Sequence, residues 1–169
     1  MYKKLALHGF VNLLLNFISS VLAGLFSAVV FGYLLLPVSD ELKRIHGKEY
    51  VQNLMEIIAF ALFVLITAFI AYKRGKMRTK REKIEAAFYW KFSSASMAVF
   101  IIPALVLFNM RNPALNNDLF IIYFPFLFLE NALKITQLSL VLSAILANAL
   151  QAGAFTLGRS KWEKASKND

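Results

Sequence analysis

Long runs of apolar residues, separated by short polar stretches, dominate the chain. The runs cover residues 6–36, 52–72, 87–109 and 119–157. A helix needs about 20 apolar residues to cross roughly 30 Å of hydrocarbon, and each run meets this requirement. The pattern therefore predicts an all-α polytopic membrane protein with four transmembrane helices, folded as a single domain over residues 1–169.

The last apolar run is too long for one crossing. A helix over all of 119–157 would measure about 58 Å at ~1.5 Å per residue, and Pro125 interrupts its start. We therefore expect an extra apolar segment at 119–129 that lies at the membrane interface, followed by a tilted span over 130–157. The alternative is a re-entrant half-helix that ends near Glu130. Interrupted helices are tolerated only where protein or water covers the freed backbone, which favours the interfacial segment.

The first predicted span carries a row of polar and small residues at every fourth position. The row consists of His8, Asn12, Asn16, Ser20, Gly24, Ala28 and Gly32. Because a helical turn holds about 3.6 residues, the row drifts around the helix and meets different neighbours. Its last four members are small and predict close helix packing. Its first three members predict hydrogen bonds across a helix interface, with a polar lining for a pathway or ligand pocket as the alternative.

One face of the last predicted span is the most polar surface in any of the spans. The face carries Glu130, Lys134, Gln137, Val141, Ala144, Asn148 and Gln151. Steps of three and four residues place these side chains along one side of a helix. Lipid offers no partner for amides or charges, so the face is expected to point into the bundle or toward another protein. An inward face favours transport, and an outward face favours assembly with a partner.

Three ionisable residues form a candidate polar cluster inside the membrane. Glu130 precedes Lys134 by four residues, the favourable order for an ion pair within a helix. Glu56 lies about one turn into the second span, at a similar predicted depth. Near a membrane interface a charged side chain can reach water, which favours structural pairing over a proton or ion path. Glu56 is the strongest functional candidate of the three.

Composition supports the membrane class. Apolar residues make up 59% of the 169 residues, and the mean hydropathy is +0.58. A net charge of +9 would suggest nucleic acid in a soluble protein, but here Lys and Arg follow the membrane topology, so no nucleic acid partner is expected. The start MYKKLALHGF resembles a signal peptide, yet the apolar run continues well past any cleavage site, so a retained span is expected.

Basic residues concentrate in the loop 73–86 between the second and third spans. The loop holds Lys73, Arg74, Lys76, Arg78, Lys80, Arg81 and Lys83. The positive-inside rule places this loop and both termini in the cytoplasm, and we expect the inner membrane of a bacterium. The charge exceeds what orientation requires, so binding of anionic lipid is a second interpretation, at about 1 kcal/mol per basic residue near the membrane.

Catalytic and metal-binding signals are missing from the sequence. The chain has no cysteine, which excludes thiolate catalysis and Cys-based metal sites. The two histidines, His8 and His46, fall on opposite sides of the predicted membrane and cannot share a metal. The sequence has no Gly-rich phosphate loop and no GxSxG or HExxH motif. We therefore expect a protein that is not an enzyme and needs no cofactor.

Two function classes rank ahead of a third, a membrane-embedded enzyme that acts on lipid or isoprenoid, for which the sequence offers no nucleophile, metal set or phosphate site. The first is a subunit or binding partner of a larger membrane assembly, in contact with lipid, another membrane protein or a second copy of the chain. This class is suggested by the row in the first span and the polar face of the last span, which together offer more helix-packing surface than one bundle is expected to bury. The second is a small oligomeric transporter or channel. Its polar pathway would run through Glu56, Glu130, Lys134, Asn12, Asn16, Asn148 and Gln151.

Overall fold

The computed structural model describes residues 2–30, 33, 36–76, 86–109 and 122–165. Within these ranges the chain is helical and contains no strand, so the prediction of an all-α fold is confirmed. The elements in chain order are α1 (Tyr2–Val29), α2 (Leu36–His46), α3 (Lys48–Lys76), α4 (Ala86–Asn109), the 3₁₀ helix η2 (Phe124–Leu127), α6 (Glu130–Leu133) and α7 (Thr136–Ala165).

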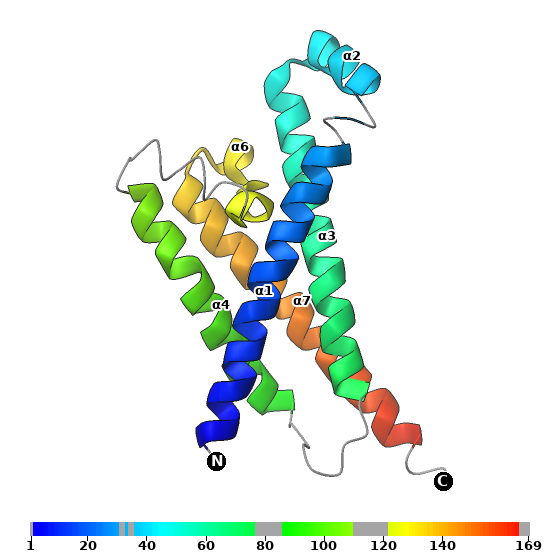
Figure 1. Ribbon diagram of the computed structural model, residues 1–169, viewed down its shortest axis with the longest axis vertical. Helices are drawn as coiled ribbons and strands as arrows, with labels where there is room; N and C mark the ends of the chain where they lie inside the picture. The colour runs from blue at the N-terminus through cyan, green and yellow to red at the C-terminus, as the bar shows by residue number, and fades with distance from the viewer. Residues whose placement is uncertain (1, 31–32, 34–35, 77–85, 110–121, 166–169) are drawn as a thin grey trace.

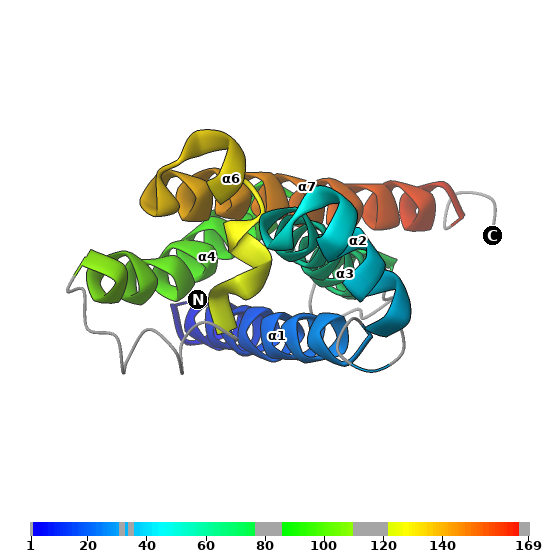
Figure 2. The same ribbon diagram turned by 90° about the horizontal axis from the view of Figure 1, so that it is seen from above.

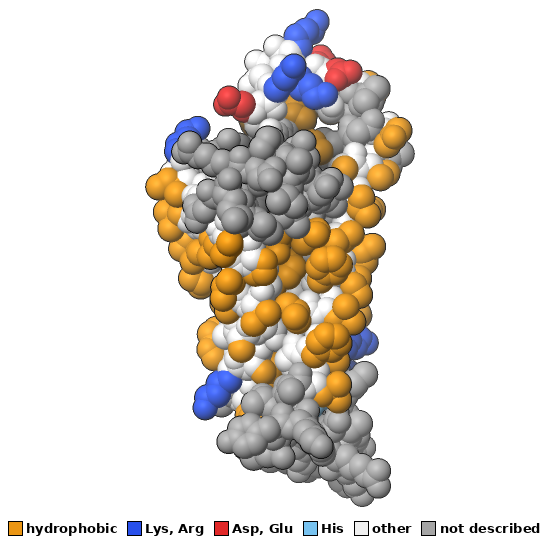
Figure 3. Space-filling view, turned by 60° about the vertical axis from the view of Figure 1, so that its left-hand side comes forward, with side chains coloured by type: hydrophobic (Ala, Val, Ile, Leu, Met, Phe, Trp, Pro, Cys, Tyr) orange, Lys and Arg blue, Asp and Glu red, His pale blue; other side chains and the backbone are white. Residues whose placement is uncertain are grey.

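Four of these helices, α1, α3, α4 and α7, are long and apolar enough to cross a membrane. Figure 3 shows apolar side chains covering the middle of the molecule, with Lys and Arg side chains above and below them. An apolar belt between two polar ends matches the hydrocarbon layer of a bilayer and its two interfaces. The prediction of a membrane protein with four candidate spans is confirmed.

The spanning helices form a bundle in which α3 lies along α7 and α1, while α4 lies against α1 and α7. Both chain termini lie at one end of the bundle, and α2 and α6 lie at the other (Figure 1). We call these the terminal end and the α2 end. An even number of crossings requires the two termini to share a side, and the bundle has this arrangement.

Helix α1 ends at Val29, whereas the sequence predicted a span over 6–36. The residues from Leu36 onward form the separate helix α2, which packs on α3 and whose sequence LPVSDELKRIH is too polar for a membrane interior. Gly47 follows the last residue of α2, has a φ of 89° and donates its N–H to the Lys43 carbonyl at 2.9 Å. Glycine suits this left-handed position because it has no Cβ. Between α1 and α2, Val30 and Tyr33 are in π-helical conformation, and residues 31–32 and 34–35 lie outside the described residues.

The described part of the extra segment is packed inside the protein. Seen from above, η2 and α6 cross the α2 end of the bundle from α1 toward α7 (Figure 2). All four η2 residues are buried, and η2 packs against α1, α3 and α7. The apolar side chains of η2 therefore fill the space between α1, α3 and α7. Residues 119–121 lie outside the described residues, and the choice between an interfacial and a re-entrant segment stays a prediction.

The last span begins at Thr136, whereas the sequence predicted a start at residue 130. Helix α6 stops at Lys134, whose φ of 56° is left-handed and whose N–H donates to the Glu130 carbonyl at 2.7 Å. A left-handed residue reverses the local path of the backbone. Glu130 and Lys134 therefore precede α7, and the predicted polar face belongs to one helix only from Gln137 onward.

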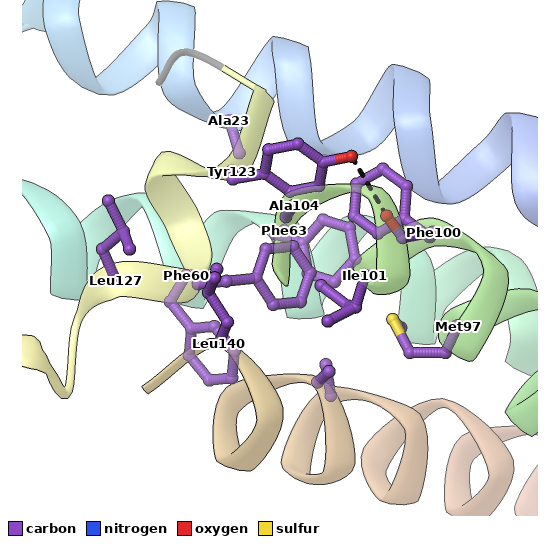
Figure 4. Close-up of a cluster of buried hydrophobic side chains, with 13 residues drawn as sticks. Ala23, Phe60, Phe63, Met97, Phe100, Ile101, Ala104, Tyr123, Leu127 and Leu140 are labelled. Atoms are coloured by element: carbon purple, nitrogen blue, oxygen red, sulfur yellow. Dashed lines mark hydrogen bonds between the residues drawn. The ribbon is translucent and has the colours of Figure 1, made fainter. Parts of the chain in front are cut away.

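An aromatic core fills the bundle on the side of the α2 end. Phe63 and Phe126 meet edge to face with their ring centroids 4.9 Å apart. Tyr123 donates its hydroxyl to the Phe100 carbonyl at 3.1 Å, as the dashed line in Figure 4 shows, and burial raises the pKa of this phenol. The core consists of Ala23, Phe60, Phe63, Met97, Phe100, Ile101, Ala104, Tyr123, Phe126, Leu127, Leu140, Ala144 and Ala147.

Helices α3 and α7 touch backbone to backbone near the terminal end. A Cβ atom on Gly75 would lie 2.3 Å from the Phe155 carbonyl oxygen, and one on Gly158 would lie 2.2 Å from the Tyr72 carbonyl oxygen. Only glycine allows an approach this close. Helix α3 continues to Lys76, beyond the predicted end at residue 72. The first residues of the predicted loop 73–86 are thus helical and belong to this crossing.

Candidate polar site inside the bundle

Helix α1 places two asparagines inside the bundle. Asn12 is 3% exposed and Asn16 is 1% exposed. The Asn12 Oδ1 atom accepts a hydrogen bond from Arg74 Nη1 of α3 at 2.9 Å, and Arg74 Nη2 lies 3.4 Å from Nδ1 of the half-buried His8. The polar half of the predicted row in α1 thus binds an arginine, which the sequence had placed in a solvent-exposed loop.

Helix α7 turns its polar face toward the same region. Gln151 is buried and donates from Nε2 to Asn16 Oδ1 at 3.2 Å. One turn away, Asn148 accepts from Ser93 Oγ at 2.6 Å and donates to Ser94 Oγ at 2.8 Å. Gln137, nearer the start of α7, is half-buried. The polar face therefore points into the bundle, because its amides find their partners on α1 and α4.

A small cavity lies where these side chains meet. Its volume is about 10 Å³, close to the roughly 10–15 Å³ that one water requires. All four spanning helices contribute to its wall. The lining residues are Asn12, Leu15, Asn16, Thr67, Ile70, Ala71, Tyr89 and Gln151. Two atoms of this lining, Asn12 Nδ2 and Asn16 Nδ2, are buried without a hydrogen-bond partner within the described residues.

Aromatic side chains separate the cavity from the terminal end. Tyr89 of α4 stacks on Phe155 of α7, with their centroids 4.0 Å apart and their planes within 5°. The Arg74 guanidinium lies 5.9 Å from the centre of the Tyr89 ring, a cation–π arrangement. His8 stacks on Phe92 at 5.9 Å. Tyr89, Phe92 and Phe155 belong to the second apolar cluster of the bundle, which packs beside the polar site.

Glu56 is buried near the α2 end, with 1% of its surface exposed. Its Oε1 atom accepts from Gln52 Nε2 at 3.0 Å, and its Oε2 atom has no hydrogen-bond partner within the described residues. Glu130 is close enough to interact electrostatically with Glu56, and it accepts a hydrogen bond from Thr136 Oγ1 at 2.5 Å. The two predicted carboxylates therefore belong to one region.

Lys134 does not join these carboxylates. Its side chain is exposed, and among the described residues it forms no ion pair with Glu130. The expected helical ion pair needs both residues on one helix, whereas the left-handed backbone of Lys134 ends α6. The structure thus gives Glu56 no cationic partner from this residue.

The small-residue half of the row in α1 only partly follows one packing face. Ser20 and Gly24 are buried, and Ser20 Oγ donates to the Ile122 carbonyl. Ala28 is exposed, and Gly32 lies outside the described residues. Ser27 lies on the packed face instead, where its Oγ donates to the Met55 carbonyl at 2.9 Å. The four-residue step drifts away from the contact, while a three-residue step restores it.

The aromatic core lies between the two polar regions. Along α3, Phe60 and Phe63 are buried between Glu56 and Thr67, and they pack against η2 through Phe126. The small cavity beside Thr67 does not include Glu56 in its wall. The packed rings therefore separate Glu56 from the small cavity.

Sequence reasoning gave no role in the site to Arg74 or Tyr89, and it did not pair Ser93 with Asn148. Arg74 belongs to a run of basic residues, so its individual role had no separate signal. Ser93 belongs to a group of small residues in the third predicted span, with Ser94 and Ser96, but its pairing with Asn148 depends on the crossing of α4 and α7. Within the described residues, no three His, Asp or Glu side chains gather in a way that could hold a metal ion.

The chain was compared with protein-family models, curated proteins and solved structures, and none of the three comparisons finds a match.

Proposed function

We propose that this chain is a small membrane transport protein, captured in a closed state, whose bundle interior binds a small polar solute or ion. The observation that carries the proposal is the convergence of polar side chains from all four spanning helices on one buried cavity. Ligand sites of helical membrane proteins are built between helices, and buried polar residues there mark substrate pathways. An inward polar face favours this function over assembly.

Two packed layers act as the closed gates in this proposal. The stack of Tyr89 on Phe155 lies toward the terminal end, and the aromatic core with Phe63 and Phe126 lies toward the α2 end. Solute reaches the cavity when one layer opens. Glu56, at the far side of the aromatic core, is the polar group that a solute meets at the α2 end.

The proposed orientation puts the terminal end in the cytoplasm of a bacterial cell, with the chain in the inner membrane. The basic residues of the loop 73–86 support this orientation through the positive-inside rule. Lys73 and Lys76 are exposed at this end and remain candidates for anionic lipid. Arg74 is assigned to the interior because it binds Asn12. The other basic residues of this loop lie outside the described residues.

Reconstitution tests the transport function. Purified protein in liposomes is expected to release at least one probe faster than protein-free liposomes. The probes are K⁺, Na⁺ and Cl⁻, followed by electrode, and glycerol and urea, followed by vesicle swelling. Asn16→Leu should reduce this flux at least tenfold, because it removes a polar group from the cavity wall. Leu65→Ala is the control, since Leu65 is 66% exposed on α3.

Size-exclusion chromatography in detergent separates loss of transport from loss of folding in these variants. Release of every probe at the rate of empty liposomes would reject the transport function. Equal flux in Asn16→Leu and the original chain would reject the assigned site. Unchanged flux in Glu56→Gln would show that transport does not depend on this carboxylate. The cavity would then be the polar part of the pathway.

The assembly function keeps one specific observation in its favour. A groove of about 430 Å³ runs between α4 and α7 on the outside of the bundle, and its wall includes Ala98, Ala144 and Ala149. Small residues let another transmembrane helix approach closely. The occupant we propose is a second copy of the chain, because two-fold dimers are the commonest oligomers.

Cross-linking tests this second candidate directly, since the chain has no cysteine. In a two-fold dimer the same surface meets itself, so Ala98→Cys should give a covalent dimer under mild oxidation in membranes. Leu65→Cys, on the exposed side of α3, should remain monomeric. Equal dimer yields from both variants would indicate random collision and would reject this interface.

A further inference from the structure

A long apolar groove follows the contact between α1 and α4 on the outside of the bundle. It consists of two adjoining hollows of about 380 Å³ and about 390 Å³, which share Phe10, Leu13 and Val99 in their walls. The floor of the groove is buried at Phe92 and Phe100, whereas its rims are exposed, with 62% of Phe10 and 55% of Val99 accessible. The groove therefore opens outward along two membrane-spanning helices.

Small residues give this groove its depth near the terminal end. Gly9 of α1 and Ala95 of α4 both line it, and a Cβ atom on Gly9 would meet no atom closer than Ser96 Oγ at 3.8 Å. The one hydroxyl in this part of the wall is already used, because Ser96 Oγ donates to the Gly9 carbonyl at 2.9 Å. The surface that the groove offers is therefore apolar, and so is the part of a ligand that fits it.

The length of the groove matches one leaflet of a bilayer. Its wall on α4 follows a four-residue step through Lys91, Ala95, Val99 and Pro103. These twelve residues rise about 18 Å at ~1.5 Å per residue, and half of a hydrocarbon core of roughly 30 Å is about 15 Å. The groove thus covers the depth of one acyl layer, starting from the terminal end.

Lys91 supplies a positive charge where the groove begins. Its side chain is exposed and lines the hollow nearer the terminal end. Trp90 precedes it with 47% of its surface exposed, and tryptophan prefers the level of the lipid headgroups. Basic pockets between membrane helices bind anionic lipid headgroups. We infer that the groove between α1 and α4 binds one anionic phospholipid, with an acyl chain along the groove and the phosphate at Lys91. This lipid site is separate from the polar cavity and is independent of the proposed transport function.

The charge at Lys91 also distinguishes this groove from the one between α4 and α7. Among the described residues, no charged side chain lines the α4–α7 groove, which suits a second copy of the chain. A two-fold contact through the α1–α4 groove would bring two Lys91 side chains into one apolar interface. Like charges in such an interface repel each other, whereas an anionic headgroup compensates the charge.

Binding is measured on the full chain in a short-chain maltoside detergent. A ligand that binds only the folded state raises the melting temperature with its concentration. Dioleoyl phosphatidylglycerol is expected to raise the melting temperature saturably and more than dioleoyl phosphatidylcholine, which has the same acyl chains without the net charge. Native mass spectrometry should show one phosphatidylglycerol retained on each chain. Equal responses to the two lipids would overturn the inference.

Lys91→Gln tests the headgroup contact. A basic residue near the membrane surface contributes about 1 kcal/mol to binding of anionic lipid, so the affinity for phosphatidylglycerol should fall about fivefold, and Lys91→Arg should restore it. Lys73→Gln is the matched control, because Lys73 is exposed at the same end of the bundle on α3. An equal loss of affinity in Lys73→Gln would indicate general attraction to a basic surface and would overturn the site.

Ala95→Phe tests the acyl chain by filling the groove. The exposed position tolerates a larger side chain, and lipid retention should fall at least tenfold. Ala98→Phe makes the same change on the other side of α4, in the α4–α7 groove, and should keep the lipid. If Ala95→Phe does not fold, Val99→Phe narrows the same groove. Unchanged retention in the folded variant would overturn the inference, whereas lipid binding without flux of any transport probe would reject transport alone.

Discussion

At the scale of single residues, the polar side chains of the spans follow a simple constraint. Hydrocarbon cannot hydrogen-bond an amide, so each amide needs protein or water as a partner. Asn148 meets this need with two serines of α4, and Gln151 meets it with Asn16. Among the described residues, the buried amide nitrogens without a hydrogen-bond partner are Asn12 Nδ2 and Asn16 Nδ2. Both line the cavity, which is why the candidate site is found there.

The pairing of Asn148 gives a stability prediction. Asn148→Ala removes the acceptor of the buried Ser93 hydroxyl. Hydrogen bonds between membrane helices contribute about 0.6 kcal/mol on average and up to about 1.7 kcal/mol. The free energy of unfolding should therefore decrease by an amount of this size. Thermal or SDS unfolding in detergent micelles measures the change.

Ile145→Ala is the matched control, because Ile145 lies one turn away on α7 with 61% of its surface exposed. Its truncation should change the unfolding free energy less than Asn148→Ala does. A larger loss in the control would show that the α4 and α7 contact depends on apolar packing and that the Asn148 hydrogen bonds add nothing measurable.

At the scale of elements, glycines set how closely α3 and α7 approach. Gly158→Ala would place a methyl group 2.2 Å from the Tyr72 carbonyl oxygen, so the helices must separate. Overpacking of this kind costs about 1–3 kcal/mol, and the melting temperature should fall. Gly153→Ala on the same helix meets no atom within 4 Å.

The Gly153 control should shift stability in the opposite direction. In an open helical position alanine is favoured over glycine by roughly 0.5–1 kcal/mol, so Gly153→Ala should be neutral or stabilising. If both alanine variants had the same melting temperature, the close crossing of α3 and α7 at Gly158 would be wrong.

Helix boundaries show where sequence reasoning worked and where it did not. The span predicted over 87–109 matches α4 (Ala86–Asn109) closely, because a basic loop and a polar stretch border it. The breaks before α2 and at Lys134 were missed. The break before α2 was missed because the sequence stays apolar up to Pro37. The break at Lys134 was missed because a lysine in the left-handed conformation has no sequence signature of its own.

At the scale of the whole molecule, the layers alternate along the bundle axis. Tyr89 and Phe155 form an aromatic layer near the terminal end, the amides form a polar layer, and the rings around Phe63 form the core beyond it. A polar layer enclosed by apolar packing is shielded from water on both sides. Hydrogen bonds in such a layer are stronger than in water for this reason.

Topology is testable on intact cells. Asp40→Cys on α2 should react with a membrane-impermeant maleimide added from outside, and Glu163→Cys near the end of α7 should react only after the cells are opened. Both positions are exposed and lie at opposite ends of the bundle, and the chain offers no other cysteine. The reverse labelling pattern would invert the proposed orientation.

The sequence by itself determined the fold class, the four spans and the shared side of the termini. It could do so because transfer into hydrocarbon depends on composition along a segment and needs no knowledge of neighbours. Only the tertiary structure decided which polar groups meet, because hydrogen bonds depend on how helices cross and rotate. Arg74 illustrates the difference: its charge marked a loop in the sequence, and the continuation of α3 brought it to Asn12 inside the bundle.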